Sequence, residues 1–93
     1  MNNVDKDESI TERQDIVRRN IVEQYIAQRK QHNLTQEELA SIMGVTRPNI
    51  SRFETGQYNP TLDLLVKMAE CMDLEIEVTL VERQGGIKKN GEE

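Results

Sequence analysis

The chain has 93 residues, of which 35% are hydrophobic and 31% charged, and its formal net charge is −5. This length suits one small domain with a single core, because a chain this short buries only roughly 60 to 65% of its unfolded surface. One cysteine excludes an intrachain disulfide framework, and no apolar run approaches the ~18 residues of a membrane span, so we expect a soluble cytoplasmic protein.

The negative net charge argues against a nucleic-acid partner, but the charge is unevenly distributed. Residues 1–12 hold one basic and four acidic residues, whereas residues 61–93 hold four basic and eight acidic ones. Residues 13–60 hold seven basic and five acidic residues and are the basic part of the chain. The composition of this central part therefore leaves a nucleic-acid function open.

Residues 1–12 are polar and acidic, which predicts a flexible N-terminal arm. Either Ser9 or Thr11 could cap a first helix after it, since each has Glu or Gln three residues later. The helix would run to about Asn33, a residue type that tolerates the left-handed conformation of a helix end. Its apolar stripe is formed by Val17, Ile21 and Tyr25, with Val22 and Ile26 alongside.

Two short helices are predicted next. In TQEELASIMG, Thr35 is the expected N-cap, Glu38 completes a capping box, and Gly44 ends the helix. VTRPNISRFETG repeats this design: Thr46 is the expected cap, Pro48 falls in the first turn, where a missing N–H is harmless, and Gly56 follows the end. Helices this short are not stable alone, so apolar residues must clamp them. These inward residues are Leu39, Ala40, Met43, Val45, Ile50 and Phe53.

After the turn QYNP, Thr61 is the expected cap of a fourth helix with an apolar stripe of Leu62, Leu65, Ala69 and Met72. The stretch LEIEVTLVE, residues 74–82, then alternates as a half-buried strand does, with Leu74, Ile76, Val78 and Leu80 on one face. A terminal helix is the alternative, because Leu74, Val78 and Val81 also fit helical spacing. The β-branched residues favour the strand.

A single strand leaves its backbone groups unpaired, so the predicted strand needs a partner. An alternating strand can pair antiparallel with its own copy across a two-fold axis, with its apolar face on the first and fourth helices. We therefore expect residues 13–73 to form the domain, residues 74–82 to be a dimerisation strand, and residues 83–93 to be a flexible tail.

The two short helices joined by MGVT form a predicted helix-turn-helix unit. The side of its second helix opposite Ile50 and Phe53 displays the candidate base-reading residues, because a guanidinium can bond guanine O6 and N7 together. These are Arg47, Pro48, Ser51 and Arg52. The candidate phosphate contacts lie around them, at helix starts and just past the second helix. They are Thr35, Gln36, Thr46, Asn49, Thr55, Tyr58 and Asn59.

The stretch LTQEELASIMGVTRPNISRFETGQYNPTLDLLVKMAECM resembles the XRE (Cro and lambda-repressor-like) helix-turn-helix family. The resemblance implies an all-α, lambda-repressor-like helix-turn-helix bundle of about four helices, with a C-terminal β-strand that pairs across a homodimer as in the HipB and HigA antitoxins. It places Arg47, Pro48 and Arg52 on bases, and it places Gln36, Thr55 and Asn59 on phosphates. It also implies a partly buried bridge between Arg29 and Glu54.

Two functions remain open. The first is a transcriptional repressor that binds an inverted repeat of double-stranded DNA as a homodimer. The second is an antitoxin whose acidic ends would suit a basic toxin protein. An enzyme lacks support, because no nucleophile, base and orienting group cluster and no cofactor loop is present. No cofactor or metal is expected, since His32 and Cys71 lack metal-ligand spacing.

Overall fold

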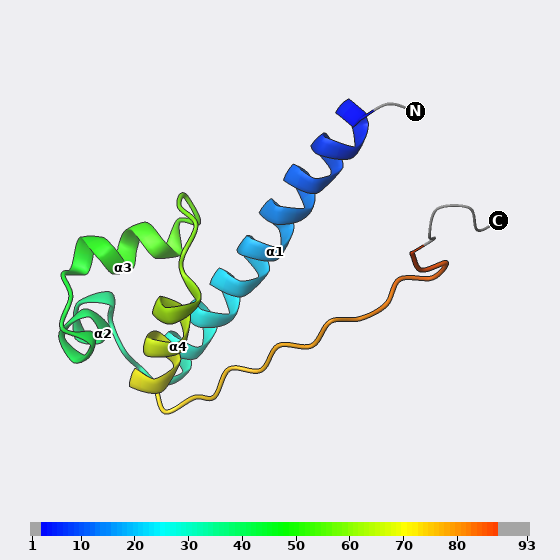
Figure 1. Cartoon of the computed structure of the whole chain (residues 1–93). Helices are drawn as coiled ribbons and strands as arrows, with labels where there is room; N and C mark the ends of the chain where they lie inside the picture. Colours follow the sequence, from blue (N-terminus) through cyan, green and yellow to red (C-terminus); the bar gives the residue numbers. More distant parts are fainter. Residues whose placement is uncertain (1–2, 88–93) are drawn as a thin grey trace.

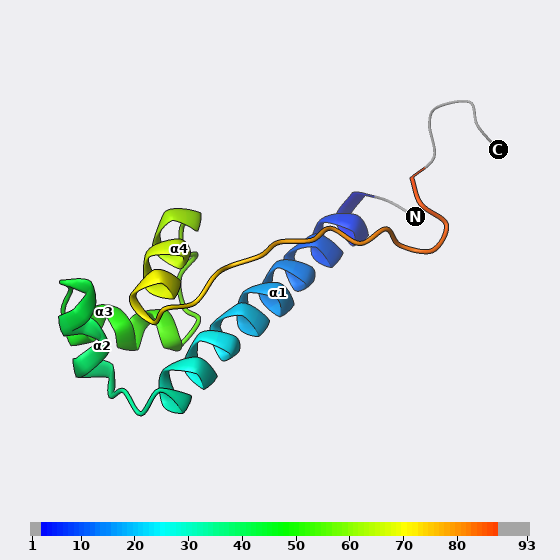
Figure 2. The same ribbon diagram turned by 90° about the horizontal axis from the view of Figure 1, so that it is seen from below.

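The computed structural model describes residues 3–87, which contain four α-helices. They are α1 (Asn3–Gln31), α2 (Gln36–Met43), α3 (Arg47–Glu54) and α4 (Leu62–Cys71). Helices α2, α3 and α4 gather around the C-terminal half of α1, whereas the N-terminal half of α1 and the chain after α4 extend away from this body (Figures 1 and 2). The predicted four-helix bundle is confirmed, and the extended parts stretch the molecule to 55 × 25 × 20 Å.

The core lies where the three shorter helices meet α1. Phe53, Leu39, Ile50 and Met68 are its largest fully buried side chains. The ring of Tyr25 on α1 meets that of Phe53 edge-on at 5.5 Å between centroids, and the Tyr25 hydroxyl donates a 2.7 Å hydrogen bond to the Leu65 carbonyl. All the predicted inward residues of α2 and α3 are buried, and Val45 between the helices is half-buried.

The ends of the short helices follow the local sequence closely. Thr35 accepts from the Glu38 N–H while Glu38 accepts from the Thr35 N–H, which is the predicted capping box. Asn33 and Gly44 take the predicted left-handed conformation, with φ of 58° and 74°. Thr61 caps α4 through the Leu64 N–H. Thr46 occupies the N-cap position of α3, but its hydroxyl makes no capping bond.

The predicted start of the first helix is wrong. Helix α1 begins at Asn3, so Ser9 and Thr11 lie inside it and most of the predicted flexible arm is helical. A helix that is already nucleated by its packing on the core can propagate toward its N-terminus at little cost, which accounts for helix where composition predicted an arm. Residues 1 and 2 of that arm lie outside the described residues. Even α1, at 29 residues, lacks an apolar stretch of the kind that a bilayer span requires among the described residues.

The predicted apolar stripes are only partly covered. On α1, Val22 and Tyr25 are buried, but Val17, in the N-terminal half of the helix, is 46% exposed. On α4, Leu62 is 62% exposed and does not belong to the buried stripe. The core-facing side of α4 and of the residue that follows it is formed by Leu65, Met68, Ala69 and Met72.

Residues 74–87, the tail, leave α4 as an extended segment that runs away from the helical body on the side of the N-terminal half of α1 and is separated from that helix in Figure 1. Leu74 and Ile76 pack against the core, whereas Val78 and Leu80 are 74% and 93% exposed. Within the described chain, no backbone group of residues 75–82 is hydrogen-bonded to another backbone group, and no strand is formed. The terminal-helix alternative is wrong, and the pairing of this segment as a strand stays a prediction. The flexible end predicted over residues 83–93 falls partly outside the described residues, which stop at residue 87.

Candidate nucleic-acid interface

The turn between α2 and α3 fixes the angle of the helix-turn-helix unit. Gly44 takes a positive φ of 74°, and the Val45 N–H donates to the Ala40 carbonyl at 2.9 Å. No atom lies within 4 Å of a Cβ built on Gly44, so glycine is needed there for backbone conformation and not for space. With Ile50 and Phe53 buried below it, α3 is held rigidly on the body of the domain.

The outer side of α3 carries the predicted base-reading residues. Arg47, Pro48 and Arg52 are exposed, and Ser51 is half-buried at the edge of this side. Neither arginine forms an ion pair within the described chain, but an Arg52 Nη donates to the Asn49 side-chain oxygen. The structure therefore brings the four residues together on one face of one helix, which we call the α3 face.

The predicted bridge between Arg29 and Glu54 is present and belongs to a larger network. Arg29 Nε lies 2.6 Å from one Glu54 oxygen, and an Nη lies 3.0 Å from the other, with both side chains 10% exposed. Arg29 also donates to the Leu34 carbonyl at 2.7 Å. Gln36 donates its amide to Glu54 at 2.9 Å. One carboxylate thus ties α1, the start of α2 and the end of α3.

The part played by Gln36 in this network was not predicted. Gln36 and Glu54 are 18 residues apart and meet only because the start of α2 crosses the end of α3. No local pattern marks such a pair. The interaction holds the Gln36 side chain at the first turn of α2, which orients a predicted phosphate contact before any ligand arrives.

The other predicted phosphate residues fall into two groups. Thr35 and Thr55 are already engaged, Thr35 in the capping box and Thr55 through a 2.8 Å bond from its hydroxyl to the Arg52 carbonyl. Thr46, by contrast, has an exposed hydroxyl without a capping bond at the start of α3. Tyr58 and Asn59 follow α3 in the loop to α4, where Tyr58 is half-buried and Asn59 exposed.

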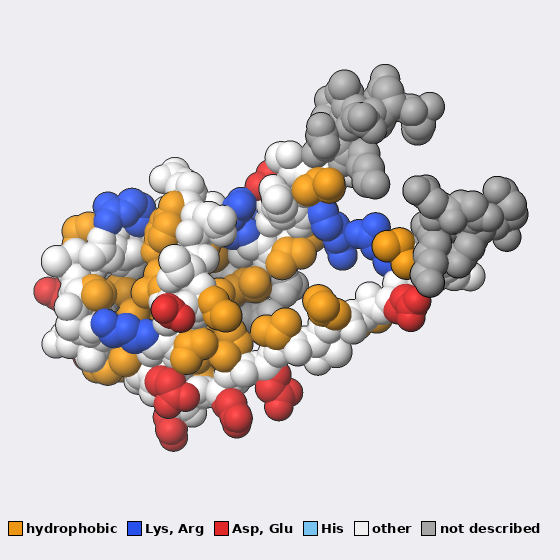
Figure 3. Space-filling model, viewed as in Figure 1, with side chains coloured by type: hydrophobic (Ala, Val, Ile, Leu, Met, Phe, Trp, Pro, Cys, Tyr) orange, Lys and Arg blue, Asp and Glu red, His pale blue; other side chains and the backbone are white. Residues whose placement is uncertain are grey.

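Basic side chains on the face seen in Figure 3 lie over the helical body and along α1, while acidic side chains line the outer edge of the tail. Within the described chain, no three His, Cys, Asp or Glu side chains come together as metal ligands would. The chemistry on the α3 face is consequently that of guanidinium, hydroxyl and amide groups, which bind phosphates and base edges.

Known proteins resemble this chain in sequence and in fold. A model of the helix-turn-helix family matches residues 26–78. An uncharacterized HTH-type transcriptional regulator of Methanocaldococcus jannaschii is 48% identical over 46 residues, which cover 50% of this chain and 70% of that protein. The antitoxin HigA1 of Mycobacterium tuberculosis is 37% identical over 62 residues, covering 67% of this chain and 42% of the antitoxin.

One solved structure shares the fold over a longer part of the chain. It belongs to a toxin-antitoxin module from Streptococcus pneumoniae and matches with a TM-score of 0.59 and 31% sequence identity. The match covers 81% of this chain and 80% of the other. The layout expected from the HipB and HigA antitoxins is thus supported by both sequence and structure.

Proposed function

Because this chain belongs to the helix-turn-helix family of transcriptional regulators, of the XRE type, we propose that it is a repressor that binds an inverted-repeat operator as a homodimer. Such a protein works in the cytoplasm, where its operator lies. Proteins of this family are typically DNA-binding and not enzymes.

The observation that carries the proposal is the α3 face. Arg47 and Arg52 project from a helix whose other side is anchored by two fully buried residues, and neither guanidinium is neutralised by a carboxylate. A guanidinium in this setting can bond a guanine in the major groove bidentately. The Arg52 guanidinium would give up its hydrogen bond to the Asn49 side chain and bond a base edge instead. Ser51 would bond a neighbouring base, and Pro48 would contact a thymine methyl group.

Phosphate contacts would then come from both ends of the helix-turn-helix unit. At the start of α2, the N–H groups of Gln36 and Glu37 have no backbone partner in the described chain and carry the positive end of the helix dipole. Gln36 donates one hydrogen bond from its side-chain amide to Glu54, and the other amide N–H would bond a phosphate at the start of α2. The remaining contacts would come from Thr35, Thr46, Asn49, Thr55, Tyr58 and Asn59.

The proposed homodimer is the reason for proposing an inverted-repeat operator. Helix-turn-helix dimers hold two reading helices about 34 Å apart, one turn of DNA. In this chain the apolar residues of the tail beyond Ile76 are exposed, and residues 75–82 make no backbone hydrogen bond within the described chain. Antiparallel pairing of residues 74–82 with a second copy would satisfy both and would set the spacing of the two α3 faces.

Salt titration of operator binding tests the DNA function directly. We expect log K to fall against log salt with a slope of several units, because phosphate contacts release counterions. Arg52→Ala should cost about 1 to 3 kcal/mol on the preferred site and relax one base position, whereas Gln36→Ala should weaken all sequences alike. Lys67→Ala, which removes an exposed charge from α4, is the matched control. A flat salt response would contradict the proposal.

The second candidate function is that of an antitoxin which also represses its own operon. It is supported by the similarity to HigA1 and by the structural match to a toxin-antitoxin module, which extends well beyond the helix-turn-helix unit. The acidic C-terminal third would suit a basic toxin. Co-expression with the product of the neighbouring gene tests this: a stoichiometric complex and relief of toxicity support it, and the absence of both contradicts it.

A further inference from the structure

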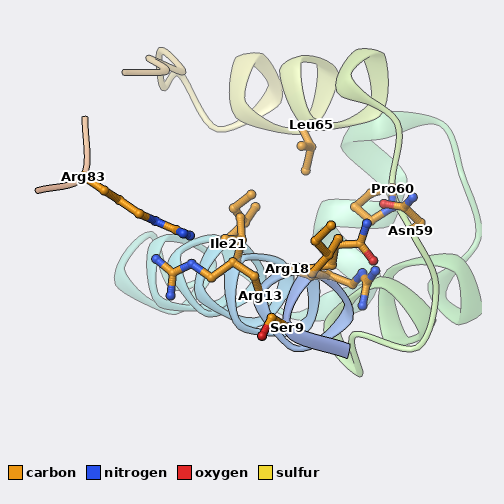
Figure 4. A pocket seen from close by; sticks show the side chains of 11 residues that line it. Ser9, Arg13, Arg18, Ile21, Asn59, Pro60, Leu65 and Arg83 are labelled. Atoms are coloured by element: carbon orange, nitrogen blue, oxygen red, sulfur yellow. The ribbon is translucent and has the colours of Figure 1, made fainter. Parts of the chain in front are cut away.

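A groove of about 590 Å³ lies between the N-terminal half of α1 and the start of α4. Figure 4 shows Leu65 directed from α4 toward α1, with Ile21 facing it and Arg13 and Arg18 at the border. The apolar lining comes chiefly from Ile10, Val17, Ile21 and Leu65. Ile10 is 48% exposed and Val17 46% exposed, so this part of the helix is apolar but uncovered. We call it the α1–tail groove, because Arg83 of the tail closes its far side.

The tail runs past this groove without filling it. Leu74 and Ile76 pack against the core and line a smaller pocket together with Gln24 and Tyr25 of α1 and Ala69 of α4. From Val78 onward the side chains are exposed, and Figure 3 shows an open gap between the tail and α1. The gap is therefore bounded on one side by the extended backbone of residues 78–82, which makes no backbone hydrogen bond within the described chain, and on the other side by apolar helix surface.

The charges around the gap indicate what it accepts. Residues 76–82 carry two acidic residues, Glu77 and Glu82, and no basic one, whereas the groove is bordered by three arginines, Arg13, Arg18 and Arg83. Arg18 Nε is buried and has no hydrogen-bond partner, although another of its nitrogens lies 2.8 Å from Asp15. A buried donor without an acceptor is costly, and an acceptor from an incoming segment would relieve it.

We propose that the α1–tail groove receives the extended segment 76–82 of a second copy of this chain. The segment has an apolar face for Ile10 and Val17, acidic residues for the arginine border, and backbone groups that pair with the tail beside it. By two-fold symmetry each copy fills the groove of the other. The N-terminal half of α1 is then a dimerisation element, and a basic partner protein would be repelled from the groove.

This inference rests on the proposed homodimer and adds to it the surface that holds the partner's tail. Val17 and Ile16 provide a matched pair of test sites, because they are adjacent on α1 and similarly exposed but only Val17 lines the groove. Val17→Asn should raise the dimer dissociation constant about tenfold or more, as for a central interface residue, and Ile16→Asn should leave it unchanged. Sedimentation equilibrium measures both, and circular dichroism confirms that both variants remain helical.

The arginine border provides a second pair. Arg13 lines the groove, whereas Arg19 lies on the side of α1 that faces α3 and the loop after it. Arg13→Glu should weaken the dimer and remove much of its salt dependence, while Arg19→Glu, with the same change of charge, should not. Equal effects of the two reversals would show a general charge effect and would overturn the assignment of the groove.

Val78→Pro separates this inference from the proposed function, because proline removes a backbone donor from the middle of the tail. If Val78→Pro leaves the dimer intact, the proposed tail-mediated dimer fails. If it yields monomers while Val17→Asn and Arg13→Glu dimerise normally, the dimer stands and only the groove assignment fails. Unchanged dimerisation of Val17→Asn together with lost binding of a co-expressed toxin would assign the groove to that partner instead.

Discussion

The helix-turn-helix unit and the tail each have a periodic apolar side, with helical spacing in the first and strict alternation in the second, but within the described chain only the first is covered. In α2 and α3, the inward residues Leu39, Ile50 and Phe53 are at most 2% exposed. In the tail, exposure rises from half-buried Ile76 to 93% at Leu80. A pattern that implies burial is thus satisfied within one chain in the first region and left unsatisfied in the second.

The difference follows from how each region is held. The helix-turn-helix unit is short and local, and its caps, its glycine turn and the Glu54 network all lie within it or contact α1. Among the described residues, the tail is anchored to the core at Leu74 and Ile76, and residues 77–82 beyond this anchor make no backbone hydrogen bond. The α3 face is therefore complete in the monomer, whereas the proposed dimer surface of the tail would be completed only by a second molecule.

The largest expected contrast comes from removing one large apolar side chain in each region. Phe53→Ala should lower the free energy of unfolding by about 3 to 5 kcal/mol, because it leaves a cavity at the centre of the core. Leu80→Ala should leave monomer stability unchanged, since its side chain is 93% exposed. Urea denaturation at low protein concentration measures both. A comparable loss for Leu80→Ala would show that the tail is covered within the monomer.

The ion pairs provide the next contrast. Glu54→Ala should cost about 3 kcal/mol, because it leaves the Arg29 guanidinium buried with only the Leu34 carbonyl as partner and releases Gln36. Asp15→Ala removes the exposed partner of Arg18 and should cost less than about 1 kcal/mol. Thermal unfolding of the two variants tests the ranking, and equal losses would contradict a structural role for the network.

Local sequence signals predicted the parts of the fold that local forces determine. The capping box at Thr35, the left-handed Asn33 and Gly44, and the inward residues of α2 and α3 depend on neighbours within a few positions. The Arg29–Glu54 bridge was expected only from family resemblance, and the third member, Gln36, was missed because it joins residues brought together by helix crossing.

The errors and open points have physical causes as well. The composition of residues 1–12 predicted a flexible arm, but α1 begins at Asn3. A helix that is already nucleated by its packing on the core can propagate toward its N-terminus at little cost. Helical periodicity placed Leu62 in the buried stripe, whereas it is the first residue of α4 and is 62% exposed. The proposed pairing of the tail would need a second chain, which no pattern within one chain can position.

Two glycines with positive φ, one in each region, allow the same comparison of stability losses with a smaller expected effect. Gly44→Ala should destabilise the domain by about 1 to 2 kcal/mol, because the turn between α2 and α3 holds its φ of 74°. Gly85→Ala, at a φ of 94° in the tail, should have little effect, because no packing prevents the backbone there from relaxing. Chemical denaturation measures both, and a loss at Gly85 as large as that at Gly44 would show that the tail is fixed in the monomer.

The smallest expected effect concerns Tyr25, whose hydroxyl is the polar group at the junction of α1 and α4. Burial raises the pKa of Tyr25 above its ordinary value of about 10, because the phenolate would lose its hydration. The unfolded chain therefore releases this proton first as pH rises. The stabilisation contributed by Tyr25 is complete below pH 10 and is lost as pH rises through the higher folded pKa.

Tyr25→Phe removes both this titration and the 2.7 Å bond to the Leu65 carbonyl. It should cost about 1 kcal/mol at neutral pH and flatten the alkaline fall in the free energy of unfolding. Tyr58→Phe is the control: it retains Tyr25, so its free energy of unfolding should fall with rising pH as that of the wild type does. Denaturation at several values between pH 8 and pH 11 distinguishes them, and an unchanged alkaline slope in Tyr25→Phe would mean that the hydroxyl is solvated, with α1 and α4 less tightly joined than this contact indicates.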